Sequence, residues 1–468
     1  MMNKTYSAVF LACMGLGLAG CNDSDDAQTI TSPPVVEEAT PNSIELVHLA
    51  SYESGIFGQS AAEIPAYDAA SKRLFVVNAQ KGMVDVLDFS QPAQPTYIQS
   101  LDAKTYLSNS EVNSVAVHNG IVALAVQAED KTQTGIVAFF KAQDLSFISQ
   151  VNVGALPDML TFTPDGRKVL VANEAEPNEG YQVDPEGSVS IIDISDGIPS
   201  LSQSNVTTLM FTGYNAQEAA LIASGIRKLK STSTLSQDFE PEYITISSDS
   251  QKAWVSLQEN NAVAEINLTN NTISDIWAMG TKDISLPGNG FDVSDNNGQV
   301  LIANWPIQAY FIPDGIANYT VGGTTYLVTA NEGDEKEYGA FTERVAVSAG
   351  AYTLDATNFP NASVLKQNYN LGRFRATNLN GNIDVDADFE TINCVGTRSF
   401  SIFNTTTKQI VFDSGDDFER YTAANLPTLF NADHENNTPK GRSRAKGPEP
   451  EGVTIAQIAT ETFAFVSL

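Results

Sequence analysis

The stretch Asp158–Glu174, DMLTFTPDGRKVLVANE, holds two short apolar runs on either side of the turn signal Pro-Asp-Gly. The first run alternates apolar and polar residues and the second is rich in β-branched residues, which together predict an antiparallel hairpin. An acidic residue precedes the first strand, and Asn173 and Glu174 follow the second. The stretch therefore supplies a template of acid, strand, turn, strand and a closing Asn, Gln or Glu.

Five further copies of this template occur, and they begin at Glu63, Glu111, Glu242, Asp314 and Glu451. Two more strands often follow a copy, and units of about 40–50 residues with four strands are typical of a β-propeller. We therefore predict an all-β fold, a β-propeller of about six to seven four-stranded blades. A β-sandwich is the alternative, because single strands of the two folds look alike.

Two segments depart from the repeat. Asn215–Lys230 has apolar residues at helical spacing and Asn215 as a candidate N-cap, which predicts one helical insertion packed on a blade. Its apolar face consists of Ala219, Leu221, Ile222, Ile226 and Leu229. The last copy, Glu451–Leu468, has only two strands, so we expect a truncated last blade. Either Ile44–Ala50 helps to close that blade or, as we favour, the sequence is a fragment.

The N-terminus has the features of a bacterial lipoprotein signal. Lys4 precedes the apolar run Tyr6–Leu18, which is too short to span a membrane, and Leu-Ala-Gly-Cys then resembles a lipobox ending at Cys21. We expect Cys21 to carry lipid after cleavage, which leaves Cys394 as the single free thiol and excludes an internal disulfide. The predicted domains are a signal peptide at residues 1–20, a flexible acidic tether at 21–43 and the propeller at 44–468. This places the protein on the periplasmic or cell-surface side of a bacterial membrane, touching the membrane only through the lipid.

The chain has 26 Lys and Arg residues against 56 Asp and Glu residues, a formal net charge of −30. Such an excess of negative charge argues against nucleic-acid binding, which needs basic residues to neutralise phosphates. It fits either a soluble surface or carboxylates gathered around cations.

The template predicts where many of these carboxylates lie. In an antiparallel hairpin, the start of the first strand and the end of the second lie at the same edge. Repetition around a propeller axis would bring these ends together near the mouth of the channel. The residues expected there are Glu63, Asp158, Glu240, Glu242, Asp314, Glu449 and Glu451 before first strands, and Asn173, Glu174, Glu176, Glu259, Asn331, Glu332 and Asp334 after second strands.

Calcium is the cation that this set of residue types favours, because it takes six to eight oxygen ligands and the chain has only three histidines. The prolines beside Glu240, Glu242, Glu449 and Glu451 would restrict the backbone and preset the carboxylates. The alternative is that each acid only caps a turn or faces water.

Three further polar stretches have open interpretations. The run Asp384–Glu390 resembles a calcium loop, but Phe389 stands where that loop needs Gly, which favours a solvated acidic loop. The segment Asp413–Glu419 either extends the carboxylate site or is a polar connection. Lys440–Lys446 is the one basic cluster; Arg444 and Lys446 are candidates to contact a phosphate, and a flexible surface loop is the alternative.

Several separated motifs resemble the choice-of-anchor I domain family: EPEYI at 240–244, YLVTANEGD at 326–334, RSFSIF at 398–403, DSGDDFE at 413–419 and KGPEPEGV at 446–453. The likeness runs from about Ile44 to the C-terminus. It implies a bacterial surface or periplasmic β-propeller, of which some are described as alkaline-phosphatase-like. The metal ligands at matching positions would be Glu174, Glu176, Glu240, Glu242, Asn331, Glu332, Asp334, Glu449 and Glu451. The chain departs from the family near Arg444, where an acidic residue is expected.

These observations predict a lipid-anchored, calcium-binding propeller that acts as a metal-dependent phosphoesterase of the alkaline phosphatase or phytase kind, on a small phosphoester. Another divalent metal could replace calcium, and the sequence identifies no catalytic residue. The alternative is a non-catalytic adhesion or scaffold protein with structural calcium. A lectin-like module has less support, because the chain has only three Trp residues as sugar platforms.

Overall fold

The computed structural model describes residues 44–384, 386–433 and 437–468. Residues His48–Leu468 form one compact unit, which holds all the strands described below. The predicted signal peptide, the acidic tether and the lipidated Cys21 lie outside the described residues, so these predictions stand as they were.

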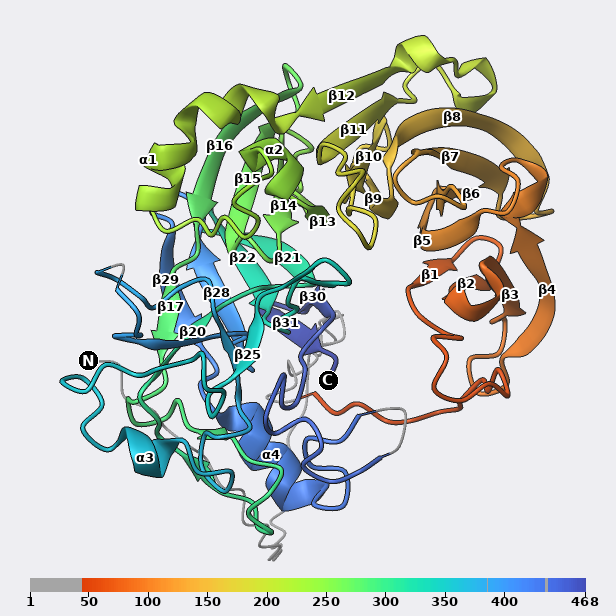
Figure 1. The fold of residues 1–468 in the computed structure, drawn as a ribbon. Coiled ribbons are helices and arrows are strands. Elements are labelled where there is room, and N and C mark those ends of the chain that lie inside the picture. The colour runs from red at the N-terminus through yellow and green to blue at the C-terminus, as the bar shows by residue number, and fades with distance from the viewer. Residues whose placement is uncertain (1–43, 385, 434–436) are drawn as a thin grey trace, which may run out of the picture. The chain divides into compact units, whose positions relative to one another are not determined.

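All six copies of the hairpin template form antiparallel strand pairs, and five of them belong to four-stranded sheets, which confirms the predicted all-β, propeller-like fold (Figure 1). The first sheet is β1 (Pro65–Asp68), β2 (Arg73–Asn78), β3 (Met83–Asp88) and β4 (Thr96–Asp102). The second is β5 (Glu111–His118), β6 (Ile121–Gln127), β7 (Thr134–Lys141) and β8 (Phe147–Ala155). The third is β9 (Pro157–Phe162), β10 (Lys168–Asn173), β11 (Ser188–Asp193) and β12 (Val206–Met210).

The remaining copies complete the series. The fourth sheet is β13 (Pro241–Ile246), β14 (Lys252–Leu257), β15 (Ala262–Asn267) and β16 (Thr272–Ala278). The fifth is β21 (Ile316–Val321), β22 (Thr324–Ala330), β28 (Phe400–Asn404) and β29 (Gln409–Asp413). The sixth copy forms the two-stranded sheet of β30 (Val453–Ile458) and β31 (Glu461–Val466). The first strands β1, β5, β9, β13, β21 and β30 contact one another in this order, so the acids that precede them fall along one line.

Four of the second strands, β6, β10, β14 and β22, are buried on both faces and divide their side chains between two cores. In β6, Val122 and Leu124 pack in one core with Phe75 of the first sheet. Ala123 of the same strand packs in another core with Val169 of the third sheet. Because successive side chains of a strand point to opposite faces, one strand contributes to the apolar interfaces on both sides of its sheet.

The predicted helix over Asn215–Lys230 is wrong beyond its middle. A 3₁₀ segment η5 (Phe211–Gln217) leads into α1 (Glu218–Ala223), and the helix ends before Gly225, whose φ of +104° lies in the left-handed region. Ile226 and Leu229 are buried as expected but lie in irregular chain, and Ile222 is exposed. Asn215 does not cap the helix; its side chain exchanges hydrogen bonds with Ser236.

A large insertion, which the template did not predict, separates β22 from β28. It contains β23 (Glu337–Tyr338), β24 (Phe341–Thr342), β25 (Arg344–Ala346), α3 (Ala362–Leu365), β26 (Arg375–Thr377) and β27 (Ile392–Val395). Strand β27 pairs in parallel with β20 (Ile307–Tyr310), which pairs antiparallel with β17 (Thr281–Asp283). The other elements are β18 (Phe291–Asp292), β19 (Ile302–Ala303), α2 (Leu235–Asp238), α4 (Asp417–Asn425), and the 3₁₀ turns η1 (Ala79–Lys81), η2 (Ala103–Thr105), η3 (Ile198–Ser200) and η4 (Gln203–Asn205).

The Asn that closes several second strands has a role within the sheet. Asn173 donates to the hydroxyls of Ser188 and Ser190 on β11 at 3.2 and 2.9 Å, and its carbonyl accepts from the Gly154 amide at 3.0 Å. Asn331 donates to Ser401 on β28 at 2.8 Å in the same way. Both side chains are fully buried, so these residues join the second strand to the third.

Candidate metal centre

Three carboxylates from two neighbouring sheets form the most buried acidic group. Glu174 follows β10, Glu240 precedes β13 and Glu259 follows β14, and one oxygen of each lies within 4.8 Å of the others. Glu240 and Glu259 are only 1% and 6% exposed. The hairpin ends therefore bring two of the predicted ligands, Glu174 and Glu240, together with Glu259, as the shared edge of the strands requires.

The positive charge next to this group does not match its negative charge. The Lys336 ammonium lies 2.7 Å from Glu240 Oε1 and donates to the Asp238 carbonyl at 3.0 Å. Within the described part of the chain, Glu240 Oε2 and Glu259 Oε2 are buried without a hydrogen-bond partner. Buried carboxylate oxygens are costly without a partner, so a cation that carries more than one charge would satisfy this group.

Burial and mutual repulsion act on all three carboxyl groups. Burial raises the pKa of Glu174, and the charges of Glu176 and Asp158 raise it further. Burial also raises the pKa of Glu259 to about 7, although Lys336 opposes the shift. A hard cation that shares these oxygens would compensate for the burial of the charges, which is the main cause of both pKa shifts, and for their repulsion.

Residues of the insertion and of the α1 loop support the group from outside. Arg227 donates to the Glu259 carbonyl at 2.7 Å, forms a buried ion pair with Glu343, and stacks 4.7 Å from the centre of the Tyr310 ring. Neither Arg227 nor Lys336 was among the sequence-predicted residues. The sequence does carry a signal for Lys336, which stands two residues after Asp334. Asp334 is the last residue of the motif YLVTANEGD, which also contains Glu332.

A second carboxylate group, Glu332, Glu449 and Glu451, is different because a lysine already lies within it. Lys446 Nζ is 2.5 Å from Glu332 Oε1, 2.6 Å from Asp334 Oδ1 and 3.7 Å from Glu449 Oε1. Glu332 Oε2 also accepts from Gln258 at 3.0 Å, and Arg442 pairs with Glu449. The protein itself supplies the counter-ions here, so the first group has the stronger need for a metal.

Three other predicted ligands, Glu176, Glu242 and Asn331, belong to neither the first nor the second group. Glu176 pairs with Lys131 and accepts from the Tyr338 hydroxyl at 2.9 Å. Glu242 and Asp314 line a larger cleft of about 980 Å³, together with Asp158, Glu63, Glu451 and residues of β30 and β31. The Asn331 carboxamide is taken up by Thr329, Ser399 and Ser401.

The third carboxylate group is the exposed loop with Asp384, Asp386 and Glu390. Asp386 Oδ1 accepts from the Asp388 amide at 2.8 Å, and Glu390 Oε2 accepts from the Ile383 amide. Loop amides therefore bind two of these carboxylates, which favours the solvated acidic loop.

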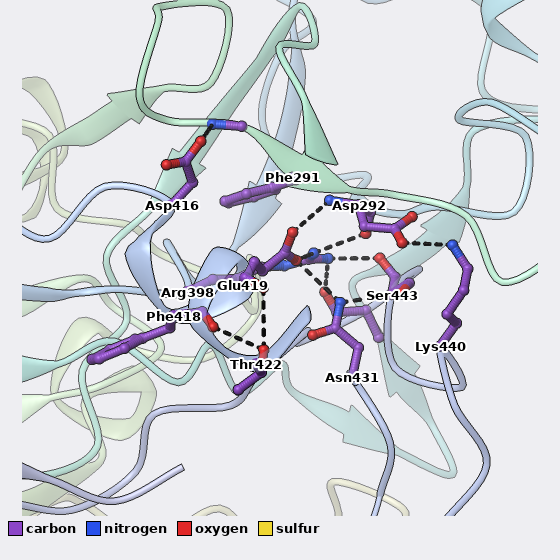
Figure 2. A network of polar contacts seen from close by, with 12 residues as sticks. Phe291, Asp292, Arg398, Asp416, Phe418, Glu419, Thr422, Asn431, Lys440 and Ser443 are labelled. Atoms are coloured by element: carbon purple, nitrogen blue, oxygen red, sulfur yellow. Dashed lines mark hydrogen bonds and ion pairs between the residues drawn. The ribbon is translucent and has the colours of Figure 1, made fainter. Parts of the chain in front are cut away.

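The segment Asp413–Glu419 serves as a polar connection. Asp413 pairs with the buried Lys282 at 2.7 Å, and Asp416 accepts from the Gly290 amide at 3.1 Å. Figure 2 shows Glu419 of α4 against the Arg398 guanidinium, with which it forms an ion pair, and Asn431 donates to the same carboxylate at 3.1 Å. None of these carboxylates belongs to the first or second group.

Arg398 holds the loop that carries the second group. Its guanidinium donates to the carbonyls of Ser443 and Ala445 at 2.8 and 2.7 Å and stacks 4.3 Å from the centre of the Phe291 ring (Figure 2). Gly447 packs so closely that a Cβ there would lie 2.6 Å from Arg398 Cδ. These contacts determine the course of the chain into Lys446.

A pocket of about 360 Å³ lies beside the first group. Five carboxylates and five cationic side chains line it: Glu176, Glu259, Asp334, Glu335 and Glu337, with Lys336, Arg344, Arg375, Arg442 and Lys446. Lys446, a predicted phosphate contact, lines this pocket, and its role as a phosphate contact stays a prediction. Arg444 lies apart from it, because its Nε contacts Asp295 Oδ2 at 3.1 Å and it lines a different pocket.

The fold and this arrangement define a propeller-like all-β domain with acidic strand ends. Over residues 63–468 the chain matches the model of the choice-of-anchor I domain, and it belongs to that family. Membership in this family indicates a surface-associated bacterial protein. Within the described residues, no helix is long and apolar enough for a membrane crossing.

Other similar proteins are more distant. Gigasin-3a from Magallana gigas is 30% identical over 101 residues, which make up 20% of this chain and 35% of that protein, so the match spans about a third of its length. A crystal structure of a protein of unknown function from Bacteroides caccae is similar over 58% of this chain and 70% of its own, with 9% identity and a TM-score of 0.32. A protein from Lactobacillus plantarum is similar over 58% of this chain and 64% of its own, with 14% identity and a TM-score of 0.34.

Proposed function

We propose that the chain is a divalent-cation-dependent phosphoesterase, with calcium as the ion that Glu174, Glu240 and Glu259 hold. The observation that carries the proposal is that Glu259, one of the three carboxylates of this under-neutralised group, lines a pocket with five cationic side chains. The pocket lining has equal numbers of positive and negative groups, so a doubly charged cation and a phosphate ester of about −2 charge would enter together without a net charge.

The chain's own residues have separate tasks in this proposal. Glu174, Glu240 and Glu259 bind the ion. Lys336 neutralises Glu240 Oε1, so the ion binds the other oxygen of that carboxylate. Arg442 and Lys446 lie on the pocket wall and orient the phosphate through charge-assisted hydrogen bonds. When bound, the ion would polarise a phosphoryl oxygen and activate water.

A second candidate function is a non-catalytic surface domain that calcium stabilises. The engagement of Lys446 by Glu332 and Asp334 favours it, because an ammonium held by two carboxylates is less available to a phosphate. The next experiment separates the two functions.

The full-length chain is expected to hydrolyse p-nitrophenyl phosphate in the presence of calcium, and to lose at least 10-fold in rate when a chelator removes the ion. Added calcium should restore the rate. Lys446→Gln should raise KM, whereas Lys252→Gln, on an exposed strand position, should leave KM unchanged. No turnover with calcium, magnesium, manganese or zinc, alongside a calcium-dependent rise in Tm, would reject the enzyme and retain the structural metal.

We also propose that Cys21 carries a lipid that anchors the chain at the cell surface, on the strength of the Leu-Ala-Gly-Cys motif. The full-length chain expressed in a bacterium should partition into the detergent phase, and the Cys21→Ser variant should remain aqueous. Equal partitioning of the two would contradict the anchor.

A further inference from the structure

Four arginines line a pocket of about 300 Å³ that the proposed metal centre does not use. They are Arg344, Arg373, Arg375 and Arg444, and the remaining wall is formed by Val345 and Ala346. Such a concentration of guanidinium groups is unexpected in a chain with a net charge of −30.

The carboxylates around the pocket do not neutralise it fully. Asp295 accepts from Arg373 Nε and Nη2 at 2.8 and 2.9 Å, and its Oδ2 also contacts Arg444. Glu335 is shared in the same way by Arg344 and Arg375, at 3.4 and 3.1 Å. Glu337, which pairs with Arg344, is the third carboxylate against four guanidinium groups, so one positive charge remains among these seven side chains.

One hydrogen-bond donor of the pocket is also without a partner in the described part of the chain. Arg375 Nε is buried and has no hydrogen-bond partner among the residues that the structure describes. Burial lowers the pKa of Arg375, and the neighbouring Arg344 and Arg444 lower it further against the influence of Glu335. An oxyanion between the arginines would satisfy the free donor and relieve this repulsion.

The backbone holds the arginines in place before any ligand binds. Arg344 and Arg375 lie on the paired strands β25 and β26, and the Arg375 amide donates to the Arg444 carbonyl at 2.9 Å. Arg398 fixes the same loop through the carbonyls on either side of Arg444. A preorganised set of donors binds an anion at a lower entropic cost than mobile side chains do.

The arginine pocket adjoins the pocket of the candidate metal centre, because Arg344 and Arg375 line both. We propose that the arginine pocket binds a phosphoryl group. This part of the inference rests on the proposed function: the group bound there is the second phosphate of a substrate whose first phosphate lies at the metal centre. The substrate class is therefore a small bisphosphorylated molecule.

The first test measures inorganic phosphate binding to the full-length chain by titration calorimetry, with a chelator present so that no metal centre can contribute. The wild-type chain should bind phosphate, and Arg373→Gln and Arg444→Gln should each weaken binding by about 10- to 100-fold. Both side chains are partly exposed, so the variants should fold. Arg420→Gln, which removes an exposed arginine of α4, is the matched control and should bind as the wild type does.

The second test compares fructose 1,6-bisphosphate with fructose 6-phosphate as substrates. The wild-type chain should have the higher kcat/KM for the bisphosphate, and Arg373→Gln should remove this preference by lowering kcat/KM for the bisphosphate. Absent phosphate binding, or binding that neither arginine variant alters, would overturn the arginine site. Phosphate binding that depends on the arginines, without hydrolysis of either sugar, would instead reject the phosphoesterase and keep the site.

Discussion

Replacing Arg398 by Met is expected to lower the free energy of unfolding by about 3–5 kcal/mol, because it leaves Glu419 buried without its counter-ion. Arg398 and Glu419 are 2% and 1% exposed. Burial raises the pKa of Glu419, and Arg398 is the charge that opposes this shift. The variant also loses the hydrogen bonds that hold the loop leading to Lys446. Urea denaturation monitored by circular dichroism would measure the change.

Arg420→Met is the control for the loss of an arginine near the same helix. Arg420 of α4 pairs with Asp416, the residue before the helix, and its side chain is 58% exposed. Its removal should cost no more than about 1 kcal/mol. The double variant Arg398→Met/Glu419→Leu should recover part of the loss, since it removes the buried charge as well. An Arg398→Met variant whose midpoint of urea unfolding equals that of the wild type would contradict the role given to Arg398.

Glu174→Gln is expected to weaken calcium binding by more than the 10- to 100-fold that loss of an outer partner of a metal site typically costs. Glu174 is a suitable ligand to test, because no salt bridge to its carboxylate occurs among the described residues, whereas Glu240 pairs with Lys336. Titration calorimetry of the chelator-treated chain would measure the affinity, and phosphoesterase activity should fall in parallel.

Asp384→Asn is the matched control, because it neutralises one acid of the exposed third group and should leave calcium affinity unchanged. Glu240→Gln is a harder test, since it also leaves Lys336 buried without its ion pair. Combining it with Lys336→Met separates the loss of a ligand from the loss of stability. Unchanged calcium affinity in Glu174→Gln would contradict the assignment of a calcium site to this group.

The parts of the fold that local sequence encodes were predictable. Each hairpin carries its own alternation and turn residues, so all six copies could be identified without long-range information. The meeting of Glu174 with Glu240 followed from strand geometry alone. Arg398 and Lys336 could not be identified in this way, because their partners lie in other elements and only the folded chain brings them together.

Two interpretations failed for opposite reasons. The apolar spacing of Asn215–Lys230 fits a helix, but the left-handed Gly225 ends the helix and its later apolar residues are buried in irregular chain. The Asn residues at strand ends have the chemistry of calcium ligands, but in Asn173 and Asn331 neighbouring serines use that chemistry to join strands. The residue type correctly indicated that these side chains make polar contacts, but the partners are serine hydroxyls of the next strand.

The division of β6 between two cores has a consequence for how this chain can evolve. A sheet in this arrangement has no hydrophobic core of its own, since Val122 and Ala123 pack in cores shared with different neighbouring sheets. Recombination that exchanges one whole sheet between relatives must preserve the packing against both neighbouring sheets. An insertion in a connecting loop changes neither of these interfaces. Diversity should therefore accumulate in segments such as the long excursion between β22 and β28, which supplies Lys336 and three of the four pocket arginines.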